Sequence, residues 1–440
     1  MTALLRRRRR STVVVLVQAG AAVAMLVSAC SGGSPGTHSG VASPSARTPS
    51  GTTPGTTSAA PGVTTPYVSR VAAAGPATSA GGHGGAAGNV YAQAGPGDLA
   101  AVARQARPMV YVPNTMAGTV QEIDPATFRV VRRFRVGAVP QHVVPSWDLR
   151  TLWVNVNNGN TLVPIDPRTG APGRAIAVED PYNLYFSPDG AHALVMAERD
   201  QRIDFRDPHT MALQHSLRVP CRGVNHADYT ADLSTLVVSC EFSGKLLVVP
   251  ADGSRVAKVI DLNTQHVPGG TAASTHGGVA HSVDPGVKSM PQDVRLTPDG
   301  RTFLAADMLA NGVWEIDAST FAVRGFLPTG AGAHGIYPSR DGRSIYVTNR
   351  DAGSVSVLDA ATLTQRALWR IPGGGSPDMG GVSADGRSLW LSGRSNAVVY
   401  VFDTTTGQVT HRIPTDAGPH GLAVWPQPGR FSLGHTGNLR

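Results

Sequence analysis

The stretch that decides the fold reads Ser344-Ile345-Tyr346-Val347-Thr348-Asn349-Arg350-Asp351-Ala352-Gly353-Ser354-Val355-Ser356-Val357-Leu358-Asp359. Apolar and polar residues alternate on both sides of a short turn that contains Gly353, a pattern typical of two antiparallel strands. Versions of this stretch recur from about residue 109 to the C-terminus. The fold therefore follows from an internal repeat.

The period of the repeat is measured between the residues that end the second strand of each pair. The steps are 42, 41, 43, 67, 42 and 44 residues, between Asp124, Asp166, Asp207, Pro250, Asp317, Asp359 and Asp403. The six aspartates each begin an Asp-x-x-Thr turn, in which the carboxylate accepts backbone N–H groups. We therefore interpret these acids as structural.

Another short strand precedes each pair. It aligns without gaps at residues 140–146, 181–187, 224–230, 291–297, 333–339, 377–383 and 419–425. An Asp-Gly turn such as Asp341-Gly342 joins it to the next strand in several units, because glycine supplies the positive φ of a hairpin turn. Four short antiparallel strands in about 42 residues are typical of a propeller blade.

The segment Ile345-Tyr346-Val347-Thr348-Asn349 resembles the signature of the YVTN-type bacterial β-propeller repeat family, and weaker copies stand at residues 110–114 and 152–155. The resemblance covers about residues 109–425. It implies the fold and little about activity, since that family includes surface and periplasmic proteins of largely unassigned function. The fourth unit departs most, with Cys240 at the Asn position and Pro250 at the Asp position.

We predict an all-β fold, a seven-bladed β-propeller with four antiparallel strands per blade. The first unit begins at Met109 without an inner strand, and the last inner strand, residues 420–424, has no blade after it. Pairing these two ends closes the ring and removes two unpaired edges. Phe431 to Asn438 resembles one more strand, which we expect to run along the outside.

The N-terminus predicts export. Residues 1–29 contain five arginines, an apolar run from Thr12 to Val27 and small residues before Cys30, which is the organisation of a signal peptide. Val27-Ser28-Ala29-Cys30 resembles the bacterial lipobox, so the resemblance implies lipidation of Cys30; an ordinary signal with a chance cysteine is the alternative. We expect a protein anchored through lipidated Cys30 to the outer face of the cytoplasmic membrane.

Three segments follow the signal. Residues 30–88 are rich in Ser, Thr, Pro and Gly, and we expect a disordered tether because they cannot bury enough apolar surface to fold. Residues 89–108 are predicted as a helical lead-in, with Asp98 as N-cap and Pro108 ending the helix. Residues 109–440 form the propeller, with an insert at residues 263–290.

The formal charge of +8 does not predict a nucleic-acid partner. Five positive charges belong to the arginines of the signal, and without them 33 basic residues balance 30 acidic ones. A nucleic-acid-binding domain needs a clustered basic face. We expect no nucleic-acid binding and a monomeric chain.

The candidate ligand site lies where the inner strands begin, at the mouth of the central channel. The first two positions of these strands carry polar or titratable side chains in every blade, namely Gln141, His142, Tyr182, Asn183, Asn225, His226, Gln292, Asp293, His334, Asp378 and His420. The insert lies on the same face and adds His266, His276 and His281 as a lid. A convergent polar ring at a channel opening is the default ligand site of such a fold.

Three interpretations of this ring stay open. It is a wet channel lined by polar groups, a pocket for a small molecule or a peptide, or a metal site built from His142, His226, His334 and His420 with Asp293 and Asp378. Imidazole and carboxylate suit Zn, Cu or Fe, but residues on different blades have no spacing that could confirm ligation. We commit to no cofactor and no catalytic residue.

Cys221 precedes the inner strand of the fourth unit and Cys240 ends the strand paired with it. In an exported protein we expect these two cysteines to form a disulfide. The alternative is a reduced pair near His226 that helps to bind a soft metal.

The sequence favours a binding or scaffold module, whose unknown small molecule or protein partner sits at the channel mouth. The alternative is an enzyme that uses the same ring, either a lactonase-like hydrolase or a metal- or tetrapyrrole-dependent oxidoreductase. The chain contains no Cys-x-x-Cys-His, His-Glu-x-x-His, P-loop or Gly-x-Ser-x-Gly motif.

Overall fold

The structure, a computed structural model, describes residues 88–268, 284–435 and 437–440. The chain divides into Met1–Ala80 and Gly81–Arg440, and the first unit lies outside the described residues. The predicted signal peptide, Cys30, the tether, His276 and His281 are therefore not described. Within the described residues, no helix has the length and apolar character needed to cross a membrane.

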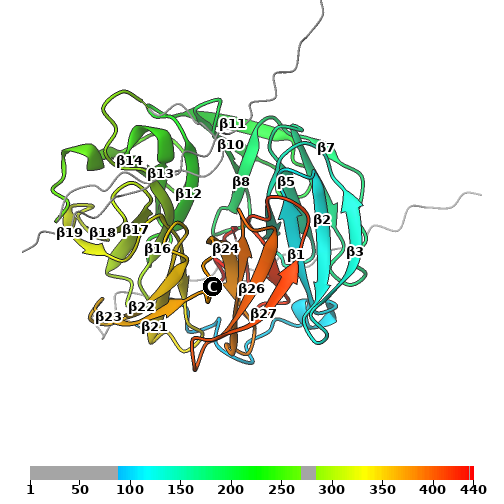
Figure 1. The fold of residues 1–440 in the computed structure, drawn as a ribbon. Helices are drawn as coiled ribbons and strands as arrows, with labels where there is room; N and C mark the ends of the chain where they lie inside the picture. The colour runs from blue at the N-terminus through cyan, green and yellow to red at the C-terminus, as the bar shows by residue number, and fades with distance from the viewer. Residues whose placement is uncertain (1–87, 269–283, 436) are drawn as a thin grey trace, which may run out of the picture. The chain divides into compact units, whose positions relative to one another are not determined.

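Seven four-stranded antiparallel sheets form the ring in Figure 1, and the predicted seven-bladed propeller is confirmed. Blades 1 to 7 are, from the inner to the outer strand, β28 (Ala423–Trp425), β1 (Met109–Asn114), β2 (Thr119–Asp124) and β3 (Arg129–Arg135); β4 (Pro140–Pro145), β5 (Leu152–Val156), β6 (Thr161–Ile165) and β7 (Ile176–Ala177); β8 (Pro181–Phe186), β9 (Ala193–Ala197), β10 (Arg202–Arg206) and β11 (Leu213–Arg218); β12 (Val224–Tyr229), β13 (Thr235–Cys240), β14 (Lys245–Pro250) and β15 (Lys258–Asp261); β16 (Pro291–Leu296), β17 (Thr302–Asp307), β18 (Gly312–Asp317) and β19 (Val323–Pro328); β20 (Ala333–Pro338), β21 (Ser344–Asn349), β22 (Ser354–Asp359) and β23 (Gln365–Arg370); β24 (Pro377–Val382), β25 (Ser388–Gly393), β26 (Val398–Asp403) and β27 (Val409–Pro414).

The ring closes as predicted. β28, the last strand of the chain, pairs antiparallel with β1, and Met109 lies opposite Trp425. The inner strands are buried along their whole length, whereas outer strands such as β11 are mostly exposed. Apolar side chains from neighbouring blades fill the spaces between sheets. Trp314 of blade 5, for example, packs with Val237 and Leu246 of blade 4.

The predicted helical lead-in is much shorter in the structure. Only the 3-10 turn η1 (Ala103–Gln105) is helical, and its N-cap position is Val102. The carboxylate of Asp98 instead accepts the N–H of Gly95. Two more 3-10 turns occur at the mouth face, η2 (Glu241–Ser243) and η3 (Leu262–Thr264).

The C-terminal segment does not run along the outside, so that prediction was wrong. Figure 1 shows the C-terminus near the centre of the ring. Phe431–His435 and Gly437–Arg440, called here the C-terminal plug, form two arms joined by a bridge between Ser432 and Leu439. The first arm pairs with the inner edge of β8, where His435 N donates to Leu184 O at 3.0 Å and Phe186 N donates to Leu433 O at 3.1 Å.

The plug enters the channel from the face opposite the mouth. Ser432 N donates to the carbonyl of Trp147, which follows the far end of an inner strand. Gly434 permits the close approach, because a Cβ there would lie 2.4 Å from Leu184 O and its φ is +100°. The plug therefore replaces solvent with protein in the lower half of the channel.

Candidate functional site

The predicted ring residues occupy the start of the inner strands because of a repeated backbone irregularity. Six inner strands shift register near their first residues, between Pro140 and His142, Pro181 and Asn183, Val224 and Ala227, Pro291 and Val294, Ala333 and Ile336, and Pro377 and Gly380. A β-bulge re-aims side chains that strict alternation would send to opposite faces. Two consecutive polar residues per blade can therefore reach the channel.

All eleven predicted ring residues are buried, and Gln141 and Tyr182 are the most exposed at 7%. They line the interior of the channel, and the structure brings them together from six inner strands and the segment before β28. Of the predicted lid, only His266 is described, and its side chain is exposed. The role of these residues in ligand binding stays a prediction.

The lower part of the ring is a histidine cluster. The ring centroids of His142 lie 5.5 Å from His226 and 5.1 Å from His435, and those of His226 and His435 lie 4.8 Å apart. Gly421 makes room for this cluster, because a Cβ there would lie 2.0 Å from His142 Nδ1. Burial lowers the pKa of all three imidazoles well below 6.5, so they are neutral at pH 7.

His435 belongs to the plug and was missed from the sequence. The residue stands between Gly434 and Gly437 in a segment predicted to lie outside the ring. The one available signal was that this segment reads as a strand with no vacant place in any blade. Nothing in the sequence showed that the channel would accept it.

The upper part of the ring is organised around Asp378. Its Oδ2 lies 2.8 Å from His420 Nδ1 and its Oδ1 lies 3.1 Å from His334 Nδ1. Arg350 Nε also donates to Oδ1 at 3.0 Å. Burial alone would raise the pKa of the Asp378 carboxyl, but these neighbours hold it well below its usual value.

The four histidines of the predicted metal set share one channel but do not converge equally. His142 and His420 have ring centroids 4.9 Å apart, whereas His226 and His334 lie 6.5 Å apart. His334 and His420 are both engaged with Asp378. The upper pair is therefore an ion-pair network, and the lower pair is the part with uncommitted ring nitrogens.

Charged residues that the sequence analysis missed follow the second strands of four blades. They are Glu198 of blade 3, Glu241 of blade 4, Arg350 of blade 6 and Arg394 of blade 7. Each stands directly after the strand end in its blade, so the repeat itself carried the signal. In a ring of seven, blades 3 and 4 face blades 6 and 7 across the channel.

The two glutamates form a coupled pair. Asn225 Nδ2 donates to Glu241 Oε2 at 2.7 Å. Burial raises the pKa of Glu241, and burial together with the Glu241 charge raises the pKa of Glu198. Two buried carboxylates this close favour sharing one proton.

The predicted disulfide is present, since Cys221 and Cys240 are bonded and their Cα atoms lie 6.0 Å apart. The bond joins the segment before β12 to the end of β13 on the mouth face. The alternative of a reduced, metal-binding pair is therefore not observed. Its place in blade 4 explains why that blade lacks the signature asparagine.

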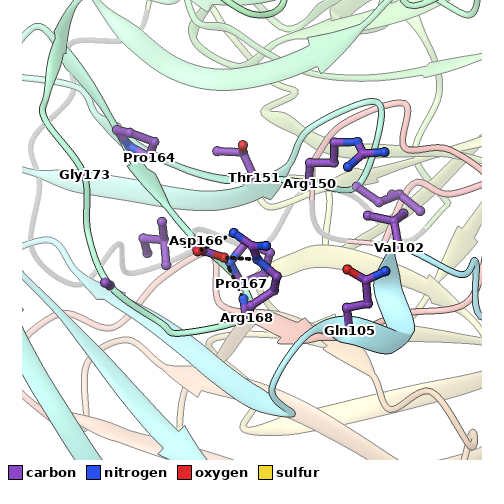
Figure 2. A pocket seen from close by; sticks show the side chains of 12 residues that line it. Val102, Gln105, Arg150, Thr151, Pro164, Asp166, Pro167, Arg168 and Gly173 are labelled. Atoms are coloured by element: carbon purple, nitrogen blue, oxygen red, sulfur yellow. Dashed lines mark hydrogen bonds and ion pairs between the residues drawn. The ribbon is translucent and has the colours of Figure 1, made fainter.

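A different pocket, shown in Figure 2, lies between η1 and the turns of blade 2. It measures about 430 Å³ and includes the exposed ion pair of Arg168 Nη2 with Asp166 Oδ2 at 3.0 Å. None of its described lining residues has a buried polar atom without a hydrogen bond. The channel, where such atoms gather, is the better candidate for a site.

Comparison with known proteins establishes the class. The model of the YNCE-like β-propeller family matches residues 68–256 and 283–428, and the chain belongs to that family. The comparison with curated proteins finds no match.

Two solved structures are similar in fold. One is Kuenenia stuttgartiensis hydrazine synthase, at 18% identity and a TM-score of 0.55, covering 68% of this chain and 93% of that one. The other is a functionally unknown protein from Desulfotomaculum acetoxidans, at 15% identity and a TM-score of 0.57, covering 73% and 100%. At these identities the likeness concerns the fold alone.

Proposed function

We propose that this propeller is a binding protein that holds a small zwitterionic molecule at the mouth of its channel. The observation that carries the proposal is a pair of opposed, incompletely satisfied charges. Among the described residues, Glu198 Oε1 and Arg394 Nη1 are buried without a hydrogen bond. A buried polar atom left in this state costs about 1–3 kcal/mol, which a ligand group would remove.

The charges on the two sides differ in sign. Arg350 and Arg394 share the single carboxylate of Asp378, with Arg394 Nη1 3.7 Å from Asp378 Oδ2, so this side keeps one excess positive charge. Glu198 and Glu241 share a proton and keep one negative charge. A ligand carboxylate at Arg394 and a ligand ammonium group at Glu198 would satisfy both sides at once.

The two charged sides also act on one another. The charges of Arg350 and Arg394 oppose the rise in the pKa of Glu241 that burial causes. Tyr182 lies within the field of Glu198, Glu241 and Arg394, and burial and the two acids raise the pKa of its hydroxyl. The hydroxyl therefore stays protonated and available as a donor between the two sides.

A thermal-shift screen with amino acids, dipeptides and betaines tests this proposal. At one hundred times the dissociation constant, a true ligand stabilises the folded state by about 2.7 kcal/mol. We expect Arg394→Gln and Glu198→Gln each to weaken the affinity, measured by calorimetry, by about tenfold or more. Arg370→Gln on exposed β23 is the matched control. Stabilisation by purely anionic or neutral compounds only would contradict the proposal.

We also propose that the mature chain is lipidated at Cys30 and held at the outer face of the cytoplasmic membrane. The support is the signal and lipobox-like pattern of residues 1–30. Radiolabelled fatty acid should appear on the mature protein and be absent from Cys30→Ala. Label that persists in the variant would reject the anchor.

A further inference from the structure

A second candidate site lies deeper in the channel, independent of what binds at the mouth. His226 of β12, Asp293 of β16 and His435 of the plug are each fully buried. Potential ligand atoms of these three side chains all lie within 4.8 Å of one another. In a tetrahedral zinc site with bonds of about 2 Å, ligand atoms lie roughly 3.3 Å apart, so small side-chain movements would close this set around an ion.

Asp293 presents one oxygen to this space. Its Oδ2 accepts the N–H of Ile336 at 3.0 Å and lies 3.4 Å from Arg295 Nη2. Its Oδ1 has no hydrogen bond among the described residues and lies 3.8 Å from His435 Nε2. The carboxylate is thus fixed by one oxygen and leaves the other for a ligand.

Asn183 orients both imidazoles. Its side-chain amide nitrogen lies 3.2 Å from His226 Nδ1 and 3.1 Å from His435 Nδ1. Because both Nδ1 atoms face Asn183, the Nε2 atoms are the ones left for an ion, and His226 Nε2 has no hydrogen bond in the described structure. Turning the amide by 180° would let its oxygen accept both Nδ1–H groups, which is the usual outer partner of a metal-binding histidine.

His142 stands beside this set as a fourth ligand. Neither of its ring nitrogens has a hydrogen bond among the described residues. Burial keeps it neutral, as it does His226 and His435, so no proton has to leave before the ring can bind an ion. Three or four nitrogen ligands with one carboxylate suit zinc, copper or nickel better than calcium or magnesium, which take mostly oxygen.

We propose that His226, Asp293 and His435 bind one divalent transition-metal ion, with His142 or water completing the coordination. The ion would connect β12 and β16 to the plug, which is otherwise held by backbone pairing with β8 and by Arg440. Metal binding would therefore couple the chain terminus to the channel wall.

Metal content and stability of the full chain test the proposal. The protein is stripped with EDTA, incubated with zinc, copper or nickel, desalted and analysed for bound metal by mass spectrometry. We expect one ion per chain and a raised melting temperature. We expect His226→Gln, His435→Gln and Asp293→Asn to lower the affinity for the ion by about tenfold or more. His215→Gln, on exposed β11, should bind like the wild type.

The readouts separate metal binding from a merely structural role. The melting temperatures of the metal-free variants report the structural contribution, and hydrogen exchange of the plug should slow on adding metal only in the wild type and the control. Substoichiometric metal in the wild type with all three ions, or equal binding by His435→Gln and Asp293→Asn, would overturn the proposal. Zwitterion binding at Arg394 and Glu198 should survive in His435→Gln, so the two proposals can fail separately.

Discussion

Two groups of carboxylates in this molecule contrast with one another. Asp403 ends β26 and accepts the N–H groups of Thr405 and Thr406 at 3.0 and 2.7 Å, and these bonds lower the pKa of its carboxyl. Asp293, inside the channel, has one oxygen without a hydrogen bond, and burial raises the pKa of its carboxyl. One aspartate is satisfied at every repeat of the turn, and the other is left in need of a partner.

The contrast separates structure from function along the period of the repeat. Features that recur at the same place in each unit, such as the Asp-x-x-Thr turn, satisfy the backbone of each blade. Features that change from blade to blade, such as the side chains at the start of the inner strands, gather unsatisfied polar atoms in one place. The identity of a residue matters less for this distinction than its place in the repeat.

The largest effect is expected from removing the partner of another channel carboxylate, Asp228. Arg440 Nη2 donates to Asp228 Oδ1 at 2.9 Å, and both side chains are buried. Arg440→Met should cost about 3–5 kcal/mol of unfolding free energy, because it leaves a buried charge without its cation. Urea denaturation measures this loss. Arg430→Met, exposed in the same segment, is the control, and equal midpoints for the two variants would break the comparison.

The sequence predicted the blades well because each strand repeats its alternation and its turns. The seven inner strands, the closing pair of β28 and β1 and the disulfide of Cys221 with Cys240 all follow local patterns that the structure confirms. The eleven ring residues were found for the same reason, since they occupy equivalent positions. Whether they bind a ligand was not predictable from the pattern.

The plug and its contacts could not be predicted from the repeat. Leu433 and His435 are fully buried only because the channel has space for them, and that space depends on side chains from seven blades. The meeting of Tyr91 with Arg440, 4.6 Å from the guanidinium carbon to the ring centroid, joins the two ends of the described domain. Such contacts between segments about 350 positions apart leave no local trace in a single sequence.

The disulfide sharpens the comparison within the regular blades. In blade 6 Asn349 Nδ2 donates to Ser354 Oγ and Ser356 Oγ at 3.2 and 3.1 Å, which joins the second strand to the third. Cys240 takes that position in blade 4, and its bond to Cys221 joins the second strand to the start of the first instead.

Replacing both cysteines by alanine should cost about 3 kcal/mol in the chain-entropy model for a loop of this length. Chemical denaturation of the variant and of the wild type with and without reductant measures the cost. The reduced wild type should match the variant. A midpoint that reductant leaves unchanged would show that the bond adds nothing to stability.

The channel histidines should make stability depend on pH in one direction. Burial lowers the pKa of His420 to about 4, and those of His142, His226, His334 and His435 are also lowered. Between pH 6.5 and about 4 the unfolded chain binds protons that the folded chain does not. Unfolding free energy should therefore fall as pH is lowered, by about 1.4 kcal/mol per pH unit for each histidine.

Glu198 acts with the opposite sign. Burial and Glu241 raise the pKa of its carboxyl, so the folded chain binds a proton that the unfolded chain has lost above pH 4.5. This contribution grows as pH falls and partly offsets the histidines. Glu198→Gln should consequently steepen the loss of stability between pH 7 and pH 5, measured by thermal denaturation. A shallower profile in that variant would contradict the assigned direction of the shift.

The smallest effect is expected at the repeated turn. Asp403→Asn keeps an oxygen that can accept the N–H groups of Thr405 and Thr406, so it removes a charge at a solvent-accessible site and little else. Asp403→Ala removes the acceptor as well and should lower the urea midpoint further than Asp403→Asn does. Asp293→Asn, the same chemical change inside the channel, should alter metal binding, whereas Asp403→Asn should leave it unchanged. If Asp403→Asn instead reduced bound metal as Asp293→Asn does, the distinction between repeated and channel carboxylates would be wrong.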